Sequence, residues 1–445
     1  MPEEKQTEIT RFIDLKKEFN KFLLLKDDGV LALLVDTIIA NQLDGDSVWM
    51  FLVAPSSGGK SELLAAFNDV EFGGNKLMFP ISDLTTNTFA SGQKKVGEET
   101  SLLHKMPSGS VMVFKDFTSM LSKNRDARAE ILGQMREVYD GEYTKRTGTG
   151  KDIVWKGKVG AMAGATEIIY DYQEDFSAMG DRFIMYSMKQ PGRQELLKFV
   201  MDKEEDPDSN KEEMRIYLKA CVKSYVGFIL ENMVDEGIVL DEETKQNIID
   251  VADFCTLVRS GVIIDKRRGH VEFVPSAEMP TRMIHQLMTI AKAMIVRHKT
   301  EPLSGGDKAP HNIGKLTEAE EKILCKVAFD SIPKKRRMAL KLLATYPVGI
   351  TTKGLATSLN YESEVVKGWL SQLNGLGVCR REGKGGPVGD TWVLNRKYHD
   401  VVIKFENIKV KEGVLEDDEF SDDDFEEIAK SWNKTPEDLD LPLEN

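Results

Sequence analysis

The chain has 445 residues, of which 41% are apolar and 30% are charged, as is typical of a soluble protein with two or three folded domains. Its four cysteines and six histidines show neither paired nor clustered spacing, which argues against a disulfide framework and a zinc site and favours a reducing, cytoplasmic location. No apolar run approaches membrane-spanning length and the first residues do not resemble a signal peptide, so we expect no membrane partner.

Residues 1–43 carry apolar side chains at helical spacing. This pattern predicts a helical N-terminal region whose apolar face packs against the rest of the protein. A partner-binding surface is the alternative, and nothing in this region indicates a chemical role.

The stretch from Val48 to Ser61 predicts a phosphate-binding loop. The apolar run to Val53 predicts a buried strand, a loop of small residues follows, and good helix formers come after Ser61. In such a loop the backbone N–H groups face phosphate oxygens, Lys60 reaches the β- and γ-phosphates, and Ser61 ligates Mg²⁺. The usual first glycine is Ala54 here, which a turn of suitable φ can tolerate. The candidate nucleotide-binding residues are Ala54, Pro55, Ser56, Ser57, Gly58, Gly59, Lys60 and Ser61. An ordinary glycine-rich turn is the alternative.

A second buried strand, Val111 to Phe114, is followed by Lys115 and Asp116. An acid at the carboxyl end of such a strand faces the nucleotide and its Mg²⁺. The usual pattern has an Asp that holds Mg²⁺ and then a Glu that polarises the attacking water. In strict register Lys115 replaces the Asp, and Asp116 takes the Glu position. If the strand slips by one residue, Asp116 binds the metal and the base is missing. Either way one carboxylate stands where two are expected, which bears on hydrolysis more than on nucleotide binding.

Residues 125–139 predict a helix, and residues 142–158 predict a β-hairpin with a glycine-rich turn. Lys145, Arg146 and Lys151 lie at or near the tip of this hairpin. Cations on a rigid hairpin suit contact with DNA phosphates, and a charged, solvated turn is the alternative.

The hairpin leads into a strand of apolar and small residues that runs from Val159 to Thr166. Thr166 ends this buried strand, next to the strand that carries the acid, where a hydroxyl can orient the attacking water. Arg182 comes just before another apolar run.

These motifs, in this order, resemble those of an AAA+ ATPase of the group with a β-hairpin before sensor 1. The chain is most similar to the minichromosome-maintenance helicases and to replication ATPases of phages and mobile elements. The resemblance covers roughly residues 45–300. It implies that Lys60 and Ser61 belong to Walker A, that Asp116 is the Walker B acid, and that Thr166 is sensor 1.

The resemblance also implies roles for two arginines and for the hairpin. Asp181–Phe183 is similar to the small-Arg-Phe motif, which makes Arg182 an arginine finger that reaches the γ-phosphate of a neighbouring subunit. Arg282 lies in a stretch that resembles the sensor 2 helix of the lid, and Lys151 matches the hairpin-tip lysine that contacts DNA in the central channel. A finger that acts in trans requires a neighbour, so we expect a homo-oligomeric ring, a hexamer. A surface ion pair is the alternative for both arginines.

Residues 193–300 predict the helices of the ATPase lid, and residues 301–333 have the composition of a linker. Residues 334–400 predict helices followed by two strands with a glycine-rich connection, which resembles a winged helix-turn-helix. From Lys334 to Tyr398 there are 12 basic and 4 acidic residues, which suits contact with a DNA backbone. A protein-interaction module is the alternative.

Residues 411–445 hold 14 acids and 3 lysines, so most of the chain's net charge of −13 lies there. This composition predicts a disordered acidic tail. The tail could dock on a protein partner through its few apolar residues, or it could compete with DNA for the basic segment before it.

The sequence therefore predicts an α/β fold. After the helical region at 1–43 come an AAA+ P-loop core at 44–192, a helical lid and a C-terminal winged helix-turn-helix. We expect an ATP hydrolase that uses ATP and Mg²⁺ and acts as a DNA helicase or translocase in the replication of a phage or mobile element. Two alternatives stay open: a non-processive replication initiator or loader, and a DNA-binding regulator that uses ATP as an assembly switch.

Overall fold

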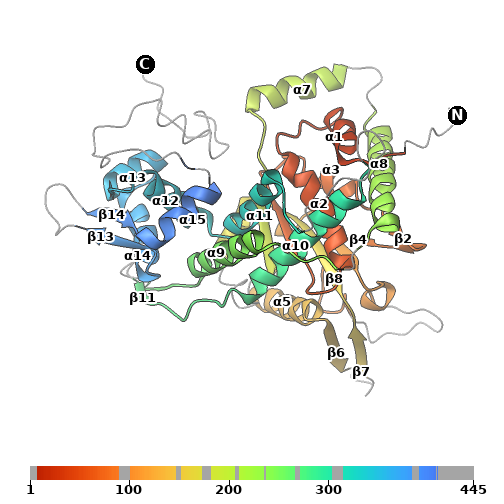
Figure 1. The fold of residues 1–445 in the computed structure, drawn as a ribbon. Coiled ribbons are helices and arrows are strands. Elements are labelled where there is room, and N and C mark those ends of the chain that lie inside the picture. The colour runs from red at the N-terminus through yellow and green to blue at the C-terminus, as the bar shows by residue number, and fades with distance from the viewer. Residues whose placement is uncertain are drawn as a thin grey trace. The chain divides into compact units, whose positions relative to one another are not determined.

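A computed structural model describes the chain in ten stretches, which form two compact units (Figure 1). The described residues are 8–89, 101–146, 152–172, 182–205, 210–234, 237–265, 271–302, 314–382, 390–406 and 408. The first unit comprises residues 1–190, 196–245 and 285–324, and the second comprises 191–195, 246–284 and 325–445. This division is not sequential. The N-terminal region belongs to the unit that holds the phosphate loop, and the expected lid at 193–300 is shared between both units.

A five-stranded parallel sheet forms the centre of the first unit. Its strands are β1 (Trp49–Val53), β4 (Met78–Ile81), β5 (Ser110–Phe114), β8 (Val159–Ala165) and β9 (Phe183–Ser187). Their order across the sheet is β4-β5-β8-β1-β9. Every residue of β1, β5 and β8 is buried, as expected for strands covered on both faces. The α/β class and the three buried strands predicted at 48–53, 111–114 and 159–166 are confirmed.

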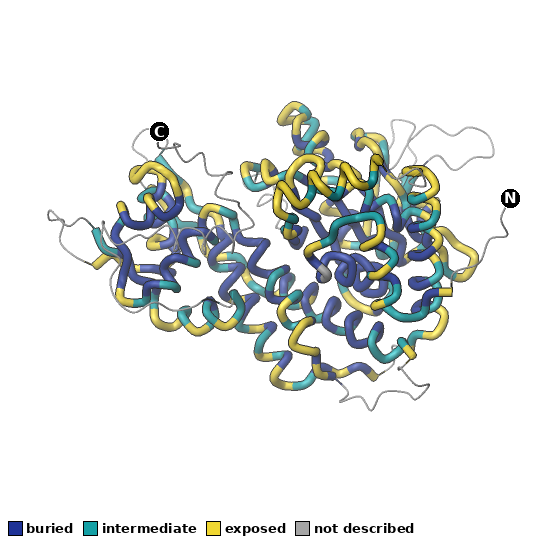
Figure 2. The backbone as a smooth tube through the Cα atoms, turned by 90° about the horizontal axis from the view of Figure 1, so that it is seen from above, coloured by how far each residue is buried: buried dark blue, intermediate teal, exposed yellow. Residues whose placement is uncertain are grey.

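Helices and short hairpins complete the first unit, and its buried stretches can be followed in Figure 2. They are α1 (Phe12–Asn20), α2 (Asp28–Gln42), α3 (Lys60–Ala65), β2 (Glu71–Phe72), β3 (Asn75–Lys76), the 3₁₀ helix Leu103–Lys105, α4 (Thr118–Leu121), α5 (Arg125–Tyr139), β6 (Glu142–Arg146), β7 (Asp152–Lys156), the 3₁₀ helix Glu167–Tyr172 and α8 (Lys211–Asn232). The predicted N-terminal helices, the helix at 125–139 and the hairpin β6–β7 are confirmed. The division between the units falls within four further helices. They are α7 (Arg193–Glu205), α9 (Glu242–Arg259), α10 (Thr281–Thr300) and α11 (Glu318–Asp330).

The small residues of β8 let other groups approach the sheet closely. A Cβ at Gly160 would lie 2.3 Å from Nδ2 of Asn41, and a Cβ at Gly164 would lie 2.6 Å from the carbonyl oxygen of Lys115. Asn41, on the buried helix α2, uses its side chain to bond both backbone groups of Val48. Glycines in β8 therefore let α2 and the residue after β5 lie close to this strand.

The second unit contains a three-stranded sheet in the order β12-β14-β13 and several helices. Its further elements are β10 (Ile263–Ile264), β11 (Val271–Phe273), α12 (Lys334–Thr345), β12 (Ile350–Thr351), α13 (Thr352–Leu359), α14 (Ser363–Gly375), β13 (Cys379–Glu382), β14 (Thr391–Leu394) and α15 (Arg396–Glu406). Asn360 ends α13 in the left-handed conformation, with φ of 52°, and separates α13 from α14. The helices and two strands predicted in this segment are confirmed. The glycine-rich connection at 383–389, residues 303–313 of the expected linker and the acidic tail lie outside the described residues. The linker prediction is wrong for the rest of 301–333, because helix α11 occupies Glu318–Asp330 and buries Leu324 and Val327.

Candidate nucleotide site

The phosphate loop expected from the sequence is residues 54–59, between β1 and α3, and its middle residues are exposed. Ser57 and Gly59 have positive φ values, of 63° and 79°. Glycine adopts this conformation at the lowest cost, which explains its presence at position 59. Ala54 does not have a positive φ, so the loop does not need a glycine at that position.

Two contacts hold the loop against neighbouring strand ends. A Cβ at Gly58 would lie 2.9 Å from Oε1 of Gln190 and 3.0 Å from the carbonyl oxygen of Pro55. Ala54 donates its backbone N–H to the carbonyl oxygen of Ala165 at 3.2 Å. The loop therefore has no room for a larger residue at position 58, and its first residue is fixed to the end of β8.

Lys60 is only 8% exposed and turns back over the loop that precedes it. Its Nζ donates to the carbonyl oxygens of Ala54 and Pro55, both at 2.7 Å. Burial lowers the pKa of Lys60, and the negative charge of Asp116 opposes that shift. A cation is thus held at the loop, with a carboxylate close enough to favour its charged form.

The loop begins at the carboxyl end of β1, next to β8, and the connections that follow these two strands run to opposite sides of the sheet. The chain leaves β1 toward β4 on one side, and it leaves the adjacent β8 toward β9 on the other side. The crevice beyond the carboxyl ends of two such strands is the usual ligand site of an open α/β sheet. The topology and the motif therefore indicate the same place.

Asp116 and Thr166 follow the carboxyl ends of β5 and β8, on the same edge of the sheet as the loop. The backbone N–H of Thr166 donates to the hydroxyl of Thr118 at 3.3 Å, and the N–H of Thr118 donates to Oδ1 of Asp116 at 2.9 Å. Phe117 donates its N–H to the carbonyl oxygen of Gly164 at 2.8 Å. These bonds tie the predicted acid and the predicted threonine to one another at this edge.

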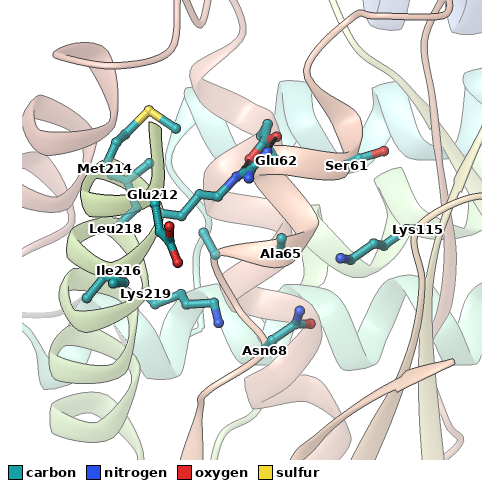
Figure 3. A pocket seen from close by; sticks show the side chains of 12 residues that line it. Ser61, Glu62, Ala65, Asn68, Lys115, Glu212, Met214, Ile216, Leu218 and Lys219 are labelled. Atoms are coloured by element: carbon teal, nitrogen blue, oxygen red, sulfur yellow. Dashed lines mark hydrogen bonds and ion pairs between the residues drawn. The ribbon is translucent and has the colours of Figure 1, made fainter. Parts of the chain in front are cut away.

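A cavity of about 650 Å³ is lined by residues of α3, α8 and the end of β5 (Figure 3), and Ser61 is the one residue of the motif at 54–61 that lines it. Ser61 and Lys115 both line it, and Lys115 extends toward α3. Strand β5 pairs with β8 up to Phe114 without a register shift. Lys115 is therefore the first residue after the strand and Asp116 is the second, and both assignments of Asp116, to the Glu position or to the metal position, stay predictions.

The residues around Ser61 do not fit the magnesium site that the sequence predicts. Ser61 and Asp116 can offer oxygens, but Oδ1 of Asp116 already accepts a hydrogen bond from Thr118. The ammonium of Lys115 shares the cavity with Ser61, and it would repel a divalent cation, which needs oxygen ligands instead. Within the described stretches, no group of three or more His, Cys, Asp or Glu side chains is arranged to hold a metal.

Helix α8 forms one wall of the cavity, and the sequence did not predict that this helix contributes to the site. Three cations at four-residue spacing on α8 pair with acids on α3 or after it, and this spacing places them on one face. The pairs are Arg215 with Glu62, Lys219 with Asp69, and Lys223 with Glu71. The spacing is visible in the sequence, but the partners, about 150 residues earlier, are not.

Arg182, the predicted arginine finger, is 6% exposed and precedes β9, so it lies at the edge of the sheet opposite the phosphate loop. Its guanidinium donates to both carboxylate oxygens of Asp140, at 2.8 and 2.7 Å, and lies 5.4 Å from the ring centre of Tyr139. Its carbonyl oxygen accepts from Gln286 at 2.7 Å. Arg182 is therefore engaged within its own chain.

Arg282, the predicted sensor 2, lies in the first turn of α10 and belongs to the second unit, whereas the phosphate loop belongs to the first. Its guanidinium lies 3.6 Å from the carboxylate of Glu278, which also accepts from Arg259 at 2.8 Å. Arg282 therefore forms the ion pair that was the alternative to a sensor 2 role.

The hairpin cations have different surroundings. Lys145 donates to the carbonyl oxygen of Thr86 at 2.9 Å and to Oδ1 of Asn87 at 2.7 Å. The Arg146 side chain is 86% exposed. Lys151 lies outside the described residues. Lys145 therefore fixes the hairpin to a nearby turn, and Arg146 is presented to solvent.

Many basic residues of the segment 334–398 are bound within the second unit. Their acidic partners include residues beyond the segment in which the charges were counted. The pairs are Arg337 with Asp330, Lys341 with Glu406, Lys367 with Glu364, Arg380 with Glu382, and Arg381 with Asp390. Arg336 is 7% exposed and donates to the carbonyl oxygens of Val258 and Ser260. The excess of positive charge on the surface is consequently smaller than the residue count suggests.

Comparisons with known proteins add no family assignment. A scan of the chain against protein-family models gave no match, and a search of curated proteins gave no relative. Within the part of the chain that the structure describes, no helix has both the length and the apolar character needed to cross a membrane.

Proposed function

We propose that the chain is an ATP hydrolase of the AAA+ type that works on DNA, as a helicase or translocase in the replication of a phage or mobile element. One observation carries the proposal: the loop ending in Lys60, the acid Asp116 and the hydroxyl of Thr166 share one edge of a parallel sheet. This edge is where an open α/β sheet binds its ligand.

Each group has a role in the proposal. The loop N–H groups and Lys60 bind the β- and γ-phosphates. Asp116, in the position of the usual Glu, accepts a proton from the attacking water, and Thr166 orients that water. Arg182 reaches the γ-phosphate of the neighbouring protomer in a hexameric ring, and Arg282 contacts the nucleotide from the lid. Lys151, Lys145 and Arg146 contact DNA phosphates.

For Arg182 to act in trans, it must leave Asp140. The bidentate pair is half-exposed on the carboxylate side, where the Asp140 side chain is 51% exposed, so water can solvate that carboxylate after the exchange. Such an exchange would make the finger available only when a neighbour presents a triphosphate.

A second function is favoured by the same two departures from the helicase pattern. Lys115 lines the cavity next to Ser61, and Arg182 is held by Asp140. In the proposal both features would reduce turnover relative to binding. The chain would then be a loader, an initiator or a DNA-binding regulator whose assembly follows ATP binding.

The experiment that tests the first function measures ATP turnover, with and without single-stranded DNA, in mixed assemblies. Lys60→Ala and Arg182→Ala are each expected to reduce turnover by about a thousandfold. Mixing the two variants should restore part of the activity, because an intact finger then faces an intact phosphate loop. Absence of restoration contradicts a finger in trans.

Strand displacement separates the two functions. A motor is expected to unwind a duplex with ATP and to lose this activity in Lys151→Ala, with Lys76→Ala as the control. ATP-dependent assembly on DNA without strand displacement supports the loader or switch. No affinity for ATP in any condition contradicts both.

A further inference from the structure

Lys115 is a cation that lines the cavity next to the start of α3. Lys115 directly follows the buried strand β5, and its side chain extends toward α3 (Figure 3). It lines the same cavity as Ser61, the residue whose hydroxyl is expected to meet a metal ion. The backbone of Lys115 packs closely against β8, because its carbonyl oxygen lies where a side chain on Gly164 would otherwise be, and the residue itself is exposed.

Lys115 differs from the other cations of the cavity in having no partner. Arg215 pairs with Glu62, and Lys219 pairs with an acid after α3. Among the residues that the structure describes, the side chain of Lys115 has no hydrogen bond and no ion pair. Its charge is nevertheless felt in the cavity, since it contributes, after the hydrogen bond from Arg215, to lowering the pKa of Glu62.

We propose that Lys115 supplies, from within the chain, the positive charge that a divalent cation supplies to the triphosphate in other P-loop sites, so that this site binds ATP without a metal ion. The inference rests on the proposed ATP site. Two cations of the chain, Lys60 and Lys115, then neutralise the phosphates, and Ser61 donates its hydroxyl to a phosphate oxygen. A divalent cation next to Lys115 would be repelled by it, so magnesium adds little to the affinity.

The test is calorimetric titration of the full chain with the non-hydrolysable analogue AMP-PNP, in excess EDTA and in excess magnesium chloride. The wild-type affinities are expected to agree within about threefold in the two conditions. Lys115→Met should lose about tenfold in EDTA, because a neutral side chain of similar length no longer offsets the phosphate charge. Lys76→Met removes an exposed lysine outside the cavity and should behave as wild type.

Lys115→Asp restores the acid of the usual pattern, so its affinity should become at least about tenfold stronger with magnesium than with EDTA. Mn²⁺ gives a second readout, because electron paramagnetic resonance reports metal bound together with AMP-PNP. We expect bound Mn²⁺ in Lys115→Asp and none in wild type. Thermal melting checks that both variants fold. If Lys115→Asp does not fold, the affinity of Lys115→Met in EDTA is by itself enough to test the inference.

The outcomes separate this inference from the proposed function. Wild-type binding that needs magnesium, or stoichiometric Mn²⁺ in the wild-type complex, overturns the role of Lys115 and leaves the ATP site standing. An affinity for AMP-PNP that Lys115→Met does not change also overturns it. No binding in either condition overturns the ATP site itself, and the inference falls with it.

Discussion

The phosphate-loop edge of the first unit and the basic segment 334–398 of the second unit both stand out in the sequence, yet the structure treats them differently. At the loop edge, Ser61 and Lys115 face a cavity, and Lys115 has no partner among the described residues. In the basic segment, cations such as Lys341 are paired with acids, and Arg336 is bound to backbone carbonyls. A motif is defined by the order and spacing of its residues, which do not change when the chain folds. A charge count does not predict a binding surface in the same way, because the fold decides which charges remain available to a ligand.

The largest change in stability should come from Arg336, which is one of the 12 basic residues that suggested DNA binding. It is buried, and burial lowers its pKa to about 10. Arg336→Met would leave the carbonyl oxygens of Val258 and Ser260 without a donor, so we expect a loss of about 3 kcal/mol in the free energy of unfolding of the second unit. Urea unfolding measures this. Arg396→Met, which removes an exposed cation of α15, should change it by less than about 0.5 kcal/mol. Equal losses would mean that Arg336 is a surface cation after all.

Lys60→Met tests the other region of the comparison. Loss of the ammonium should weaken ATP binding by about a hundredfold, because the charge of Lys60 then no longer meets the β- and γ-phosphates. The free energy of unfolding should change by less than about 1 kcal/mol, since Lys60 bonds only its own loop, at Ala54 and Pro55. Titration calorimetry and urea unfolding give the two values. A variant that loses more than about 1 kcal/mol of stability but binds ATP normally would show that Lys60 stabilises the fold and does not bind the phosphates.

Two glycines sharpen the contrast between the units. Gly164→Ala places a Cβ 2.6 Å from the carbonyl oxygen of Lys115 and should cost about 2 kcal/mol of stability, with weaker ATP binding. Gly368→Ala on α14 meets no atom within 4 Å and should stabilise the second unit by about 0.7 kcal/mol through helix propensity. Thermal melting compares them. Equal effects would show that the edge at Gly164 can relax without cost.

The smallest effects should appear in the salt dependence of DNA binding. The Arg146 side chain is 86% exposed, and its Nε lies 3.8 Å from the carboxylate of Asp152, which is a long ion pair. Arg146→Ala should weaken binding severalfold and reduce the slope of log affinity against log salt by about 0.9. Arg381→Ala removes a cation that already pairs with Asp390, so its slope should hardly change. Fluorescence anisotropy over a range of salt concentrations measures both. A larger change in slope for Arg381→Ala than for Arg146→Ala would show that the basic segment 334–398 contacts DNA.

Local sequence patterns predicted the elements that depend on local chemistry. Continuous apolar runs predicted β1, β5 and β8, because buried parallel strands need apolar side chains on both faces. Glycine placement predicted the hairpin and the phosphate loop. Partners could not be predicted in this way. Arg182 bonds Asp140, which lies 42 residues earlier, and Lys341 bonds Glu406 near the end of α15. Such pairs are decided by tertiary packing, which no short window of sequence contains.

The strand order has a consequence for how the protein is made. Strand β1 ends at Val53, but its neighbours β8 and β9 begin only at Val159 and Phe183. As the ribosome delivers the chain from its N-terminus, the loop after β1 therefore emerges long before either strand that supports it. A nascent chain of a hundred residues would carry the whole Lys60 motif and still lack a place to hold it. If the proposed site binds nucleotide, the ligand assists folding only at the last stage of assembling this sheet.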